Sequence, residues 1–556
     1  MTKRPARQAS WILIAGIAAL AVAAPIAALV VTAAGGTEEL WSDLVAYVLP
    51  VAARDTAVLL AGVGIATALI GAGTAWLVAA HEFPGRRIFD WALLLPLAVP
   101  TYIVAYAYLD VLHPVGPVQT ALRALIGVDS PRDLQLPDIR SMGGCIFVLS
   151  CVLYPYVYLT TRAMFMMQAA NLIDVARTLG HGRRRVFFRV ALPLARPAVA
   201  VGVSLVLLET LNDIGAAEFL GVRTLTVSVY TTWITRSDLP GAAQLALAML
   251  AVVVCVVALE RWARRRRRYA NDAQHPRPLP RGRLRGAGGA FASIACALPI
   301  FAGFVVPAWY LVDATVERVR FAGIPTRILG EIVNTVALSA TATLIAVVLA
   351  LLVVQAARAG TGVLPRLFLR TASLGYALPG TVLAIGLLPI VTGIEAAVDR
   401  AATGLVGVST GLFLLGSGAA VVYAYVARFL TISAGAVESG FSRVSPSIDA
   451  AARTLGASTG GTLLRVHLPL LRPALVTGAL LVFVDCMKEL PATLLLRPLG
   501  FETLATHLYG EAIRGTYEDA AIAALAIVAV GLVPVLILTR VGTRPAQAQA
   551  ITPAVM

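Results

Sequence analysis

Two segments of this chain, DVARTLG at residues 174–180 and AAARTLG at residues 450–456, end in the same five letters. RVALPLARPAV (189–199) follows the first segment, and RVHLPLLRPAL (465–475) follows the second at the same spacing. Agreement of two motifs at one fixed offset indicates an internal duplication. A repeat of this kind decides the architecture of a chain.

The composition indicates a membrane protein. Of 556 residues, 58% are hydrophobic and 13% are charged, and the mean hydropathy is +0.82. An average soluble domain has about 25% charged residues, so this chain has too few charges to cover a soluble surface. The net charge of +15 would suggest nucleic acid in a soluble protein. Here the apolar excess indicates a bilayer, and we expect no nucleic-acid partner.

Runs of about 20 apolar residues predict twelve transmembrane helices. They cover residues 11–33, 57–80, 90–111, 143–164, 197–220, 241–259, 288–312, 335–356, 370–393, 407–427, 474–496 and 519–539. With six spans per copy, both copies of the repeat face the same way. We therefore predict an all-α membrane protein made of two parallel six-helix repeats.

The segment at 260–287 divides the two predicted repeats, which cover residues 1–259 and 288–556. It is rich in Arg, Pro and Gly, which predicts a flexible cytoplasmic linker. An alternative is that its arginines bind anionic lipid head groups. The weaker likeness of DTAVLL (55–60) to NTVALS (334–339) extends the duplication towards the start of each repeat.

Basic residues predict that both termini are cytoplasmic. The runs Arg183–Arg185 and Arg264–Arg268 fall in loops on the same side as the N-terminus, and cytoplasmic loops are enriched in Arg and Lys. The first apolar run is too long for the core of a signal peptide, so we expect an uncleaved anchor. Both ARTLG loops then lie in the cytoplasm.

The sequence lacks several catalytic motifs. Its only lysines, Lys3 and Lys488, do not follow a glycine, so no P-loop is present. H-E-x-x-H and C-x-x-C are also absent, and the five cysteines lie in or beside apolar runs, where cysteine is usually a small hydrophobic residue. We expect no catalytic residue, no metal site and no cofactor in this chain.

Each ARTLG loop has the composition of a helical elbow. Ala, Leu and Arg favour helix, and Gly180 can end that helix. A second short helix is expected to follow, until Pro193 stops it before the next span. Such an elbow is either a docking surface for a partner protein or a structural re-entry loop without a partner. Its duplication favours a partner that is also present twice.

The loop resembles the EAA loop of ABC-importer permeases, in which E-A-A, three residues, G, nine residues and I-x-L-P follow one another. The matching positions are Asp174, Val175, Ala176, Gly180, Val190, Leu192 and Pro193 in the first copy, and Ala450, Ala451, Ala452, Gly456, Val466, Leu468 and Pro469 in the second. The first copy has Asp for the family's Glu. The second has Ala450 there, with Asp449 one residue earlier.

The resemblance implies the type I ABC importer transmembrane fold. It implies coupling loops that dock on two copies of a separate ATPase subunit, a substrate-binding protein outside, and a bacterial plasma (inner) membrane, most simply with a periplasm. MKELPATLLLRP (487–498) and TLATHLYG (503–510) look most like ferric-iron importer permeases. Fused permeases for thiamine share much of this architecture, and single-copy relatives carry other solutes.

Polar residues inside the predicted fifth and eleventh spans repeat as well. They are Glu209, Asn212 and Asp213, and at the equivalent positions Asp485, Lys488 and Glu489. Ionisable residues in spans are costly and suggest function, and each triplet shares one helix face. One interpretation is that they line the translocation path, because carboxylates and the phenolates of Tyr154, Tyr156 and Tyr158 suit Fe(III). The other is structural: the acids neutralise Lys488 or cap broken helix ends.

Two rival classes remain at this stage. An ion-coupled secondary transporter also has twelve spans in two parallel halves, but it does not explain the duplicated ARTLG loop. A membrane-embedded enzyme lacks a catalytic constellation.

Overall fold

A computed structural model describes residues 4–35, 38–128, 130–132, 136–167, 182–265, 281–359 and 362–542. Within these ranges the chain is helical almost throughout. The strands found there are β1 (His81–Glu82) and β2 (Gly282–Arg283), which pair in parallel. The prediction of an all-α membrane protein is confirmed.

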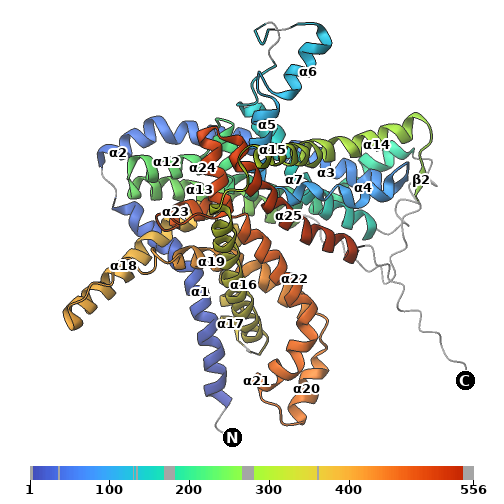
Figure 1. Cartoon of the computed structure of the whole chain (residues 1–556). Coiled ribbons are helices and arrows are strands. Elements are labelled where there is room, and N and C mark those ends of the chain that lie inside the picture. The colour runs from blue at the N-terminus through green and yellow to red at the C-terminus, as the bar shows by residue number, and fades with distance from the viewer. Residues whose placement is uncertain are drawn as a thin grey trace, which may run out of the picture.

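The first repeat contains long apolar helices joined by short ones (Figure 1). Its elements, with η for short 3₁₀- or π-helical segments, are α1 (Arg4–Ala34), α2 (Glu38–Asp43), η1 (Leu44–Val48), α3 (Leu49–Ala80), β1, α4 (Arg86–Ala92), η2 (Leu95–Ala98), α5 (Thr101–Val111), α6 (Pro117–Ile126), α7 (Met142–Met167), α9 (Arg183–Val186), η3 (Phe187–Ala191), α10 (Leu192–Asn212), α11 (Gly215–Phe219), α12 (Leu225–Arg236) and α13 (Leu239–Arg265).

The second repeat has a similar succession of elements, although α2, η1 and α6 have no counterpart in it. Its elements are β2, α14 (Ala287–Ile300), η4 (Phe301–Val305), α15 (Val306–Ala322), α16 (Arg327–Ala359), α17 (Val363–Ala372), η5 (Gly375–Ala377), α18 (Gly380–Val406), α19 (Ala419–Phe441), α20 (Pro446–Thr454), α21 (Thr459–Thr462), η6 (Leu463–His467), α22 (Leu468–Met487), α23 (Pro491–Leu496), α24 (Leu504–Arg514) and α25 (Tyr517–Gly542).

The duplication extends to single hydrogen bonds. The hydroxyl of Thr56 accepts the backbone N–H of Leu225 at 2.9 Å, and the hydroxyl of Thr335 accepts that of Leu504 at 2.9 Å. Both threonines come from the weakly similar segments DTAVLL and NTVALS. Each bond ties the third helix of a repeat to the short helix before its last span, so the two halves share tertiary structure as well as sequence.

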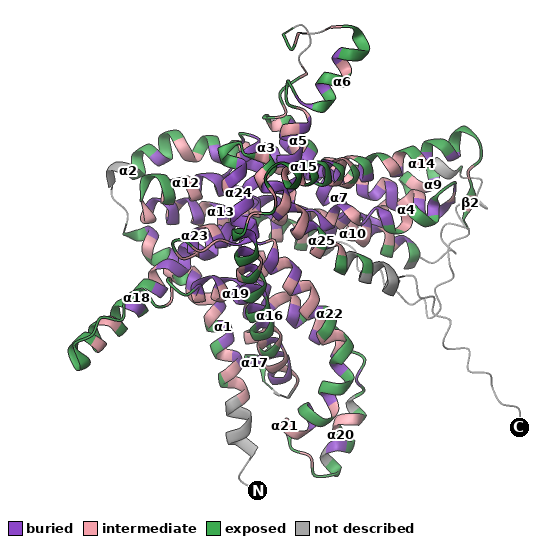
Figure 2. Ribbon diagram, viewed as in Figure 1, coloured by how far each residue is buried: buried purple, intermediate pink, exposed green. Residues whose placement is uncertain are grey.

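The two halves interlock at their first helices. Helix α1 packs against α16, α17 and α18 of the second repeat, and α15 packs against α5 of the first repeat and against α25. Helix α13 also contacts α18. Figure 2 shows the buried residues gathered where the halves meet, whereas α6 and the far end of α18 are largely exposed. The site described below lies in this junction.

Ten helices in the described ranges are long and apolar enough to cross a membrane. An eleventh candidate is the pair Arg86–Ala98 and Thr101–Val111, bent by 90°, where we predicted the third span. The twelfth predicted span falls on α25, which runs into a stretch whose side chains are not described. The chain is a multi-pass membrane protein.

Several span boundaries were predicted wrongly. The ninth predicted span (370–393) is displaced to Gly380–Val406, and the tenth (407–427) to Ala419–Phe441. Residues 407–418 are apolar but mostly non-helical, and Gly407, Gly411 and Gly418 have positive φ there, a conformation that glycine favours. Hydropathy alone does not register such a break.

Pro193 does not separate two helices as we expected. A π-helical turn, η3, precedes α10, and the two form one span, Phe187–Asn212. Proline lacks a backbone N–H, and a π turn shifts the hydrogen-bond register so that the helix continues. The same device, η6, precedes Pro469.

Candidate functional site

Four helix breaks meet at the centre of the molecule. They lie between η2 and α5, between α10 and α11, between η5 and α18, and between α22 and α23. A cavity of about 100 Å³ lies there. Irregular backbone at membrane depth is tolerated where it is buried in protein or lines a cavity, so these breaks mark a specialised site.

All six polar residues singled out in the sequence line this one cavity: Glu209, Asn212, Asp213, Asp485, Lys488 and Glu489. They come from the ends of α10 and α22 and the turns that follow. The fold therefore brings the duplicated triplets together from both halves. Their role as a translocation path stays a prediction.

Asp213 and Glu489, which are equivalent in the repeat, both accept backbone N–H groups at the start of the next short helix. Asp213 Oδ1 accepts the backbone N–H of Ala216 at 2.7 Å, at the start of α11. Glu489 accepts the N–H groups of Ala492 and Thr493, each at 3.1 Å, at the start of α23. A carboxylate at a helix N-terminus satisfies unpaired donors. For these two acids the structural interpretation, capping of a broken helix end, describes their contacts.

Glu489 also forms a buried ion pair that the sequence did not suggest. Its Oε1 lies 3.0 Å from Nη1 of Arg428 on α19, and the two side chains are 2% and 6% exposed. A Cβ on Gly380 would lie 2.6 Å from this carboxylate and 2.9 Å from this guanidinium. A glycine at the start of α18 thus lets the backbone approach the pair closely.

The remaining polar residues of the cavity are only partly buried. Lys488 Nζ pairs with Asp485 Oδ1 at 2.8 Å, and both side chains are partly exposed. Tyr376 in η5 donates its hydroxyl proton to Glu209 Oε1 at 2.5 Å. Asn212 Oδ1 accepts the backbone N–H of Gly380 at 2.7 Å. Lys488 is thus neutralised by Asp485 and not by Glu489.

The cavity carries more negative than positive charge. Four carboxylates line it, against the two cations Lys488 and Arg428. Among the described residues, neither Glu209 nor Asp213 has a cationic side chain within 4 Å; Asp213 accepts instead from the hydroxyl of Thr101. In the same part of the chain no three His, Cys, Asp or Glu side chains gather as a metal-binding group. The arrangement presents carboxylate oxygens without forming a metal cage.

Only one of the three tyrosines in α7 reaches the cavity. Tyr156 lines it, whereas Tyr154 and Tyr158 are fully buried in a separate core. Tyr158 donates to the backbone oxygen of Asp90 at 3.0 Å. The expectation that all three phenolates serve the path is therefore wrong for Tyr154 and Tyr158. They share one side of α7 and not the side that Tyr156 occupies.

The second ARTLG loop forms the predicted helical elbow. Asp449, Ala450 and Ala452 lie on α20, and Gly456 follows with φ of +79°, the left-handed conformation expected at a helix end. The corresponding Asp174, Ala176 and Gly180 lie outside the described residues. Leu192, Pro193, Leu468 and Pro469 begin α10 and α22.

Asp449 is bound by its own chain. Its Oδ2 lies 2.8 Å from Nη2 of Arg358, in the last turn of α16, and its Oδ1 lies 2.6 Å from Nε2 of His467 in η6. Partial burial acts to raise the pKa of the Asp449 carboxyl, but the hydrogen bonds from His467 and Arg358 outweigh it and hold the pKa below its usual value. The elbow is thereby fastened to two transmembrane helices.

Comparisons with known proteins agree with this architecture. Residues 59–269 match the family model described as binding-protein-dependent transport system inner membrane component. The chain is 23% identical over 495 residues to the Fe(3+)-transport system permease protein FbpB 2 of Haemophilus influenzae, covering 87% of this chain and 89% of that protein. It is 30% identical over 197 residues to the molybdenum transport system permease protein ModB of Escherichia coli, covering 34% of this chain and 82% of ModB.

A third relative is the putative 2-aminoethylphosphonate transport system permease protein PhnU of Salmonella typhimurium. It is 28% identical over 198 residues, which cover 35% of this chain and 68% of that protein. FbpB 2 thus aligns with most of the chain, whereas ModB and PhnU each align with about a third of it. The chain belongs to the family of binding-protein-dependent transport system inner membrane components, and it is a permease subunit of an ABC importer.

Proposed function

We propose that this permease carries ferric iron across the membrane through the cavity between its halves. The observation that carries the proposal is the excess of carboxylates in that cavity. Carboxylate oxygens are hard ligands that suit Fe(III), and a formal negative charge disfavours oxyanions such as molybdate or a phosphonate. Similarity to FbpB 2 over most of the chain supports the same cargo.

The cavity is better suited to letting iron pass than to holding it tightly. A path that bound iron tightly would release it slowly, and here the carboxylates are occupied in part by helix ends and cations. Selection of the cargo then falls to an external binding protein, which we propose docks on the outer loops. The loop that contains α6 projects from the bundle (Figure 1), away from α20 and α21.

Two copies of an ABC ATPase subunit are the proposed partners on the opposite side. They would engage the loops at 171–196 and 447–472, which repeat at a fixed spacing. Closure of the ATPases on ATP draws the loops together and rocks the halves to an outward-facing state, and hydrolysis resets them. Both chain termini then lie in the cytoplasm of a bacterial cell, and this chain supplies no catalytic group.

Thiamine is the second candidate cargo, because an organic cation also fits a negatively charged cavity. The test is uptake of radioactive ferric iron by cells that express this chain with its transport partners, in competition with excess thiamine or molybdate. We expect neither competitor to reduce iron uptake. Uptake of thiamine or molybdate in place of iron would contradict the assignment of cargo and leave the family unaffected.

A further inference from the structure

A second, larger cavity lies at one end of the second half. It measures about 1040 Å³, and its lining includes four arginines: Arg261 on α13, Arg358 on α16, and Arg366 and Arg370 on α17. Glu438 on α19 is the one acid that lines it among the described residues. The cavity is therefore strongly cationic, in contrast to the central one.

Several elements place this cavity at the depth of the lipid head groups. Three candidate membrane spans end there: Leu239–Ala263, Arg327–Arg358 and Ala419–Phe441. Arg261 and Arg358 lie in the last turn of their spans, where arginine side chains usually reach the interface. The pocket opens on the side of the second ARTLG loop, since Arg358 also binds Asp449 there.

Helix α17 has the composition of a helix that lies in the membrane surface. Val363, Leu364 and Leu367 are exposed to 82%, 48% and 51%, and Arg366 and Arg370 lie beside them in the sequence. Apolar side chains exposed next to arginines are typical of interfacial amphipathic helices. The apolar side chains of α17 would then contact acyl chains, and its arginines would contact phosphates.

The arginines of α17 are available to a ligand. Among the residues that the structure describes, neither Arg366 nor Arg370 has a carboxylate within 4 Å, and both are exposed. The guanidinium group binds phosphate oxygens in a bidentate manner. Arg358 is committed to Asp449, so the phosphate ligands that this pocket offers are Arg366 and Arg370 of α17 together with Arg261 of α13.

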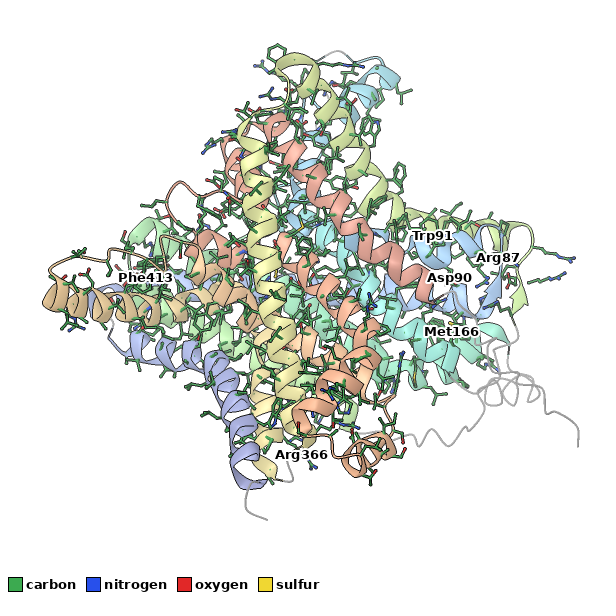
Figure 3. The ribbon with its side chains drawn as sticks, turned by 60° about the horizontal axis from the view of Figure 1, so that its bottom comes forward. Arg87, Asp90, Trp91, Met166, Arg366 and Phe413 are labelled. Atoms are coloured by element: carbon green, nitrogen blue, oxygen red, sulfur yellow. The ribbon has the colours of Figure 1, made fainter. Side chains whose placement is uncertain are left out.

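The equivalent region of the first half has a different charge pattern. Its short helix α4 carries Asp90, which pairs with Arg162 at 2.6 Å, and Arg86, which pairs with Glu82 at 3.1 Å. Figure 3 shows Arg87, Asp90 and Trp91 close together in one part of the molecule and Arg366 in another. Glu82 also pairs with Arg281, so three arginines of this region have acidic partners, whereas Arg366 and Arg370 have none among the described residues.

We propose that the pocket lined by Arg261, Arg358, Arg366 and Arg370 binds the phosphate head group of one anionic phospholipid per chain. The pocket is cationic, it lies where three candidate spans end, and the neighbouring helix α17 exposes apolar side chains. A free phosphate ion would meet the same guanidinium groups, but it would make no use of the apolar side chains.

The test is native mass spectrometry of the full chain, purified in micelles that contain equal amounts of phosphatidylcholine and phosphatidylglycerol. We expect one phosphatidylglycerol to remain bound in preference to phosphatidylcholine, and the double variant Arg366→Gln/Arg370→Gln to lose this preference. The control Arg320→Gln/Arg400→Gln removes two exposed arginines elsewhere and should retain it. The variant Arg366→Lys/Arg370→Lys keeps the charge and should retain most of it.

Three results would overturn the proposal. The first is no preference in the unaltered chain, and the second is a preference that the Gln variant keeps. The third is displacement of phosphatidylglycerol by excess inorganic phosphate, which would assign the pocket to a soluble anion. The first measurement uses the unaltered chain, so it does not depend on the folding of any variant.

Discussion

Glu489, at the break after α22, and Arg428 of α19 form an ion pair in the buried junction of the molecule, with 3.0 Å between Oε1 and Nη1. The same carboxylate caps α23 through two backbone N–H groups. One side chain thus holds the broken end of a span and the neighbouring helix in a fixed relation beside the cavity.

Glu489→Gln should destabilise the protein strongly. Removal of one partner from a buried pair leaves the other charge uncompensated, at a cost of about 3–5 kcal/mol. Thermal unfolding in detergent should show a clear fall in Tm. The matched control is Glu209→Gln, because Glu209 accepts a hydrogen bond from Tyr376 and has no cation beside it among the described residues. Equal Tm values for the two variants would contradict a structural role for the pair.

The double variant Glu209→Ala/Asp485→Ala should lose transport while remaining folded. Both side chains face the cavity and neither caps a helix. We expect initial iron uptake to fall about tenfold or more at equal protein level, which corresponds to about 1.4 kcal/mol in the free energy of passage.

The control for this pair is Asp313→Ala/Glu317→Ala, which removes two exposed acids from α15. Asp485→Asn tests whether an unpaired Lys488 alone blocks passage. Undiminished uptake by the Glu209/Asp485 variant would exclude these carboxylates from the path.

Asp449→Asn should loosen the second coupling elbow. The substitution removes the charge that binds Arg358 and His467, at a cost of about 1.5–3 kcal/mol for hydrogen bonds to a charged group. Uptake and transport-stimulated ATPase activity should both fall, and Asp449→Glu should restore part of each. If the ATPase no longer co-purifies while Tm is unchanged, Asp449 contacts the ATPase instead of its own chain.

The same contact predicts a pH dependence. Because the pKa of Asp449 is lower in the folded protein than the usual value of about 3.9, its stabilising effect is present above that usual value. It is lost as the pH falls through the lower, folded value. Between pH 5 and 8 the difference in Tm between the parent chain and Asp449→Asn should not change through titration of Asp449. Loss of this difference already at pH 5 would mean that the carboxyl is not held as described.

Gly456→Ala should weaken association with the ATPase. Gly456 has φ of +79°, and a residue with a Cβ pays about 1–2 kcal/mol in this conformation. Gly456→Asn should be milder, because asparagine tolerates it. Gly460→Ala is the matched control, since Gly460 lacks a positive φ and a Cβ there meets no atom within 4 Å. Co-purification of the ATPase should fall in the order Gly460→Ala, Gly456→Asn, Gly456→Ala, and an equal yield for all three would contradict the role of this turn.

The sequence predicted the parallel repeat and the polar triplets because both recur at a fixed offset. It did not predict that α1 packs against the second half. Hydropathy shows that a helix is apolar, but it does not show which helices it contacts. Arg428 was missed for a definite reason: the predicted tenth span ended at residue 427, so this arginine was not recognised as an intramembrane charge.

The helix breaks were also missed. The predicted fifth and eleventh spans ran through Asp213 and Glu489, although an acid inside an apolar run can satisfy the free N–H groups of a helix that begins there. Tyr376 gave no signal, because its position depends on the break between η5 and α18. The cavity is made by these breaks, and hydropathy averaged over 20 residues does not resolve them.

The most direct test of the account is transport by the purified chain in liposomes, with its ATPase on one side and its iron-loaded binding protein on the other. We predict iron uptake that requires ATP and the binding protein and that is lost with Glu209→Ala/Asp485→Ala but kept with Asp313→Ala/Glu317→Ala. Uptake driven by an ion gradient without the ATPase, or equal uptake by the two double variants, would contradict it.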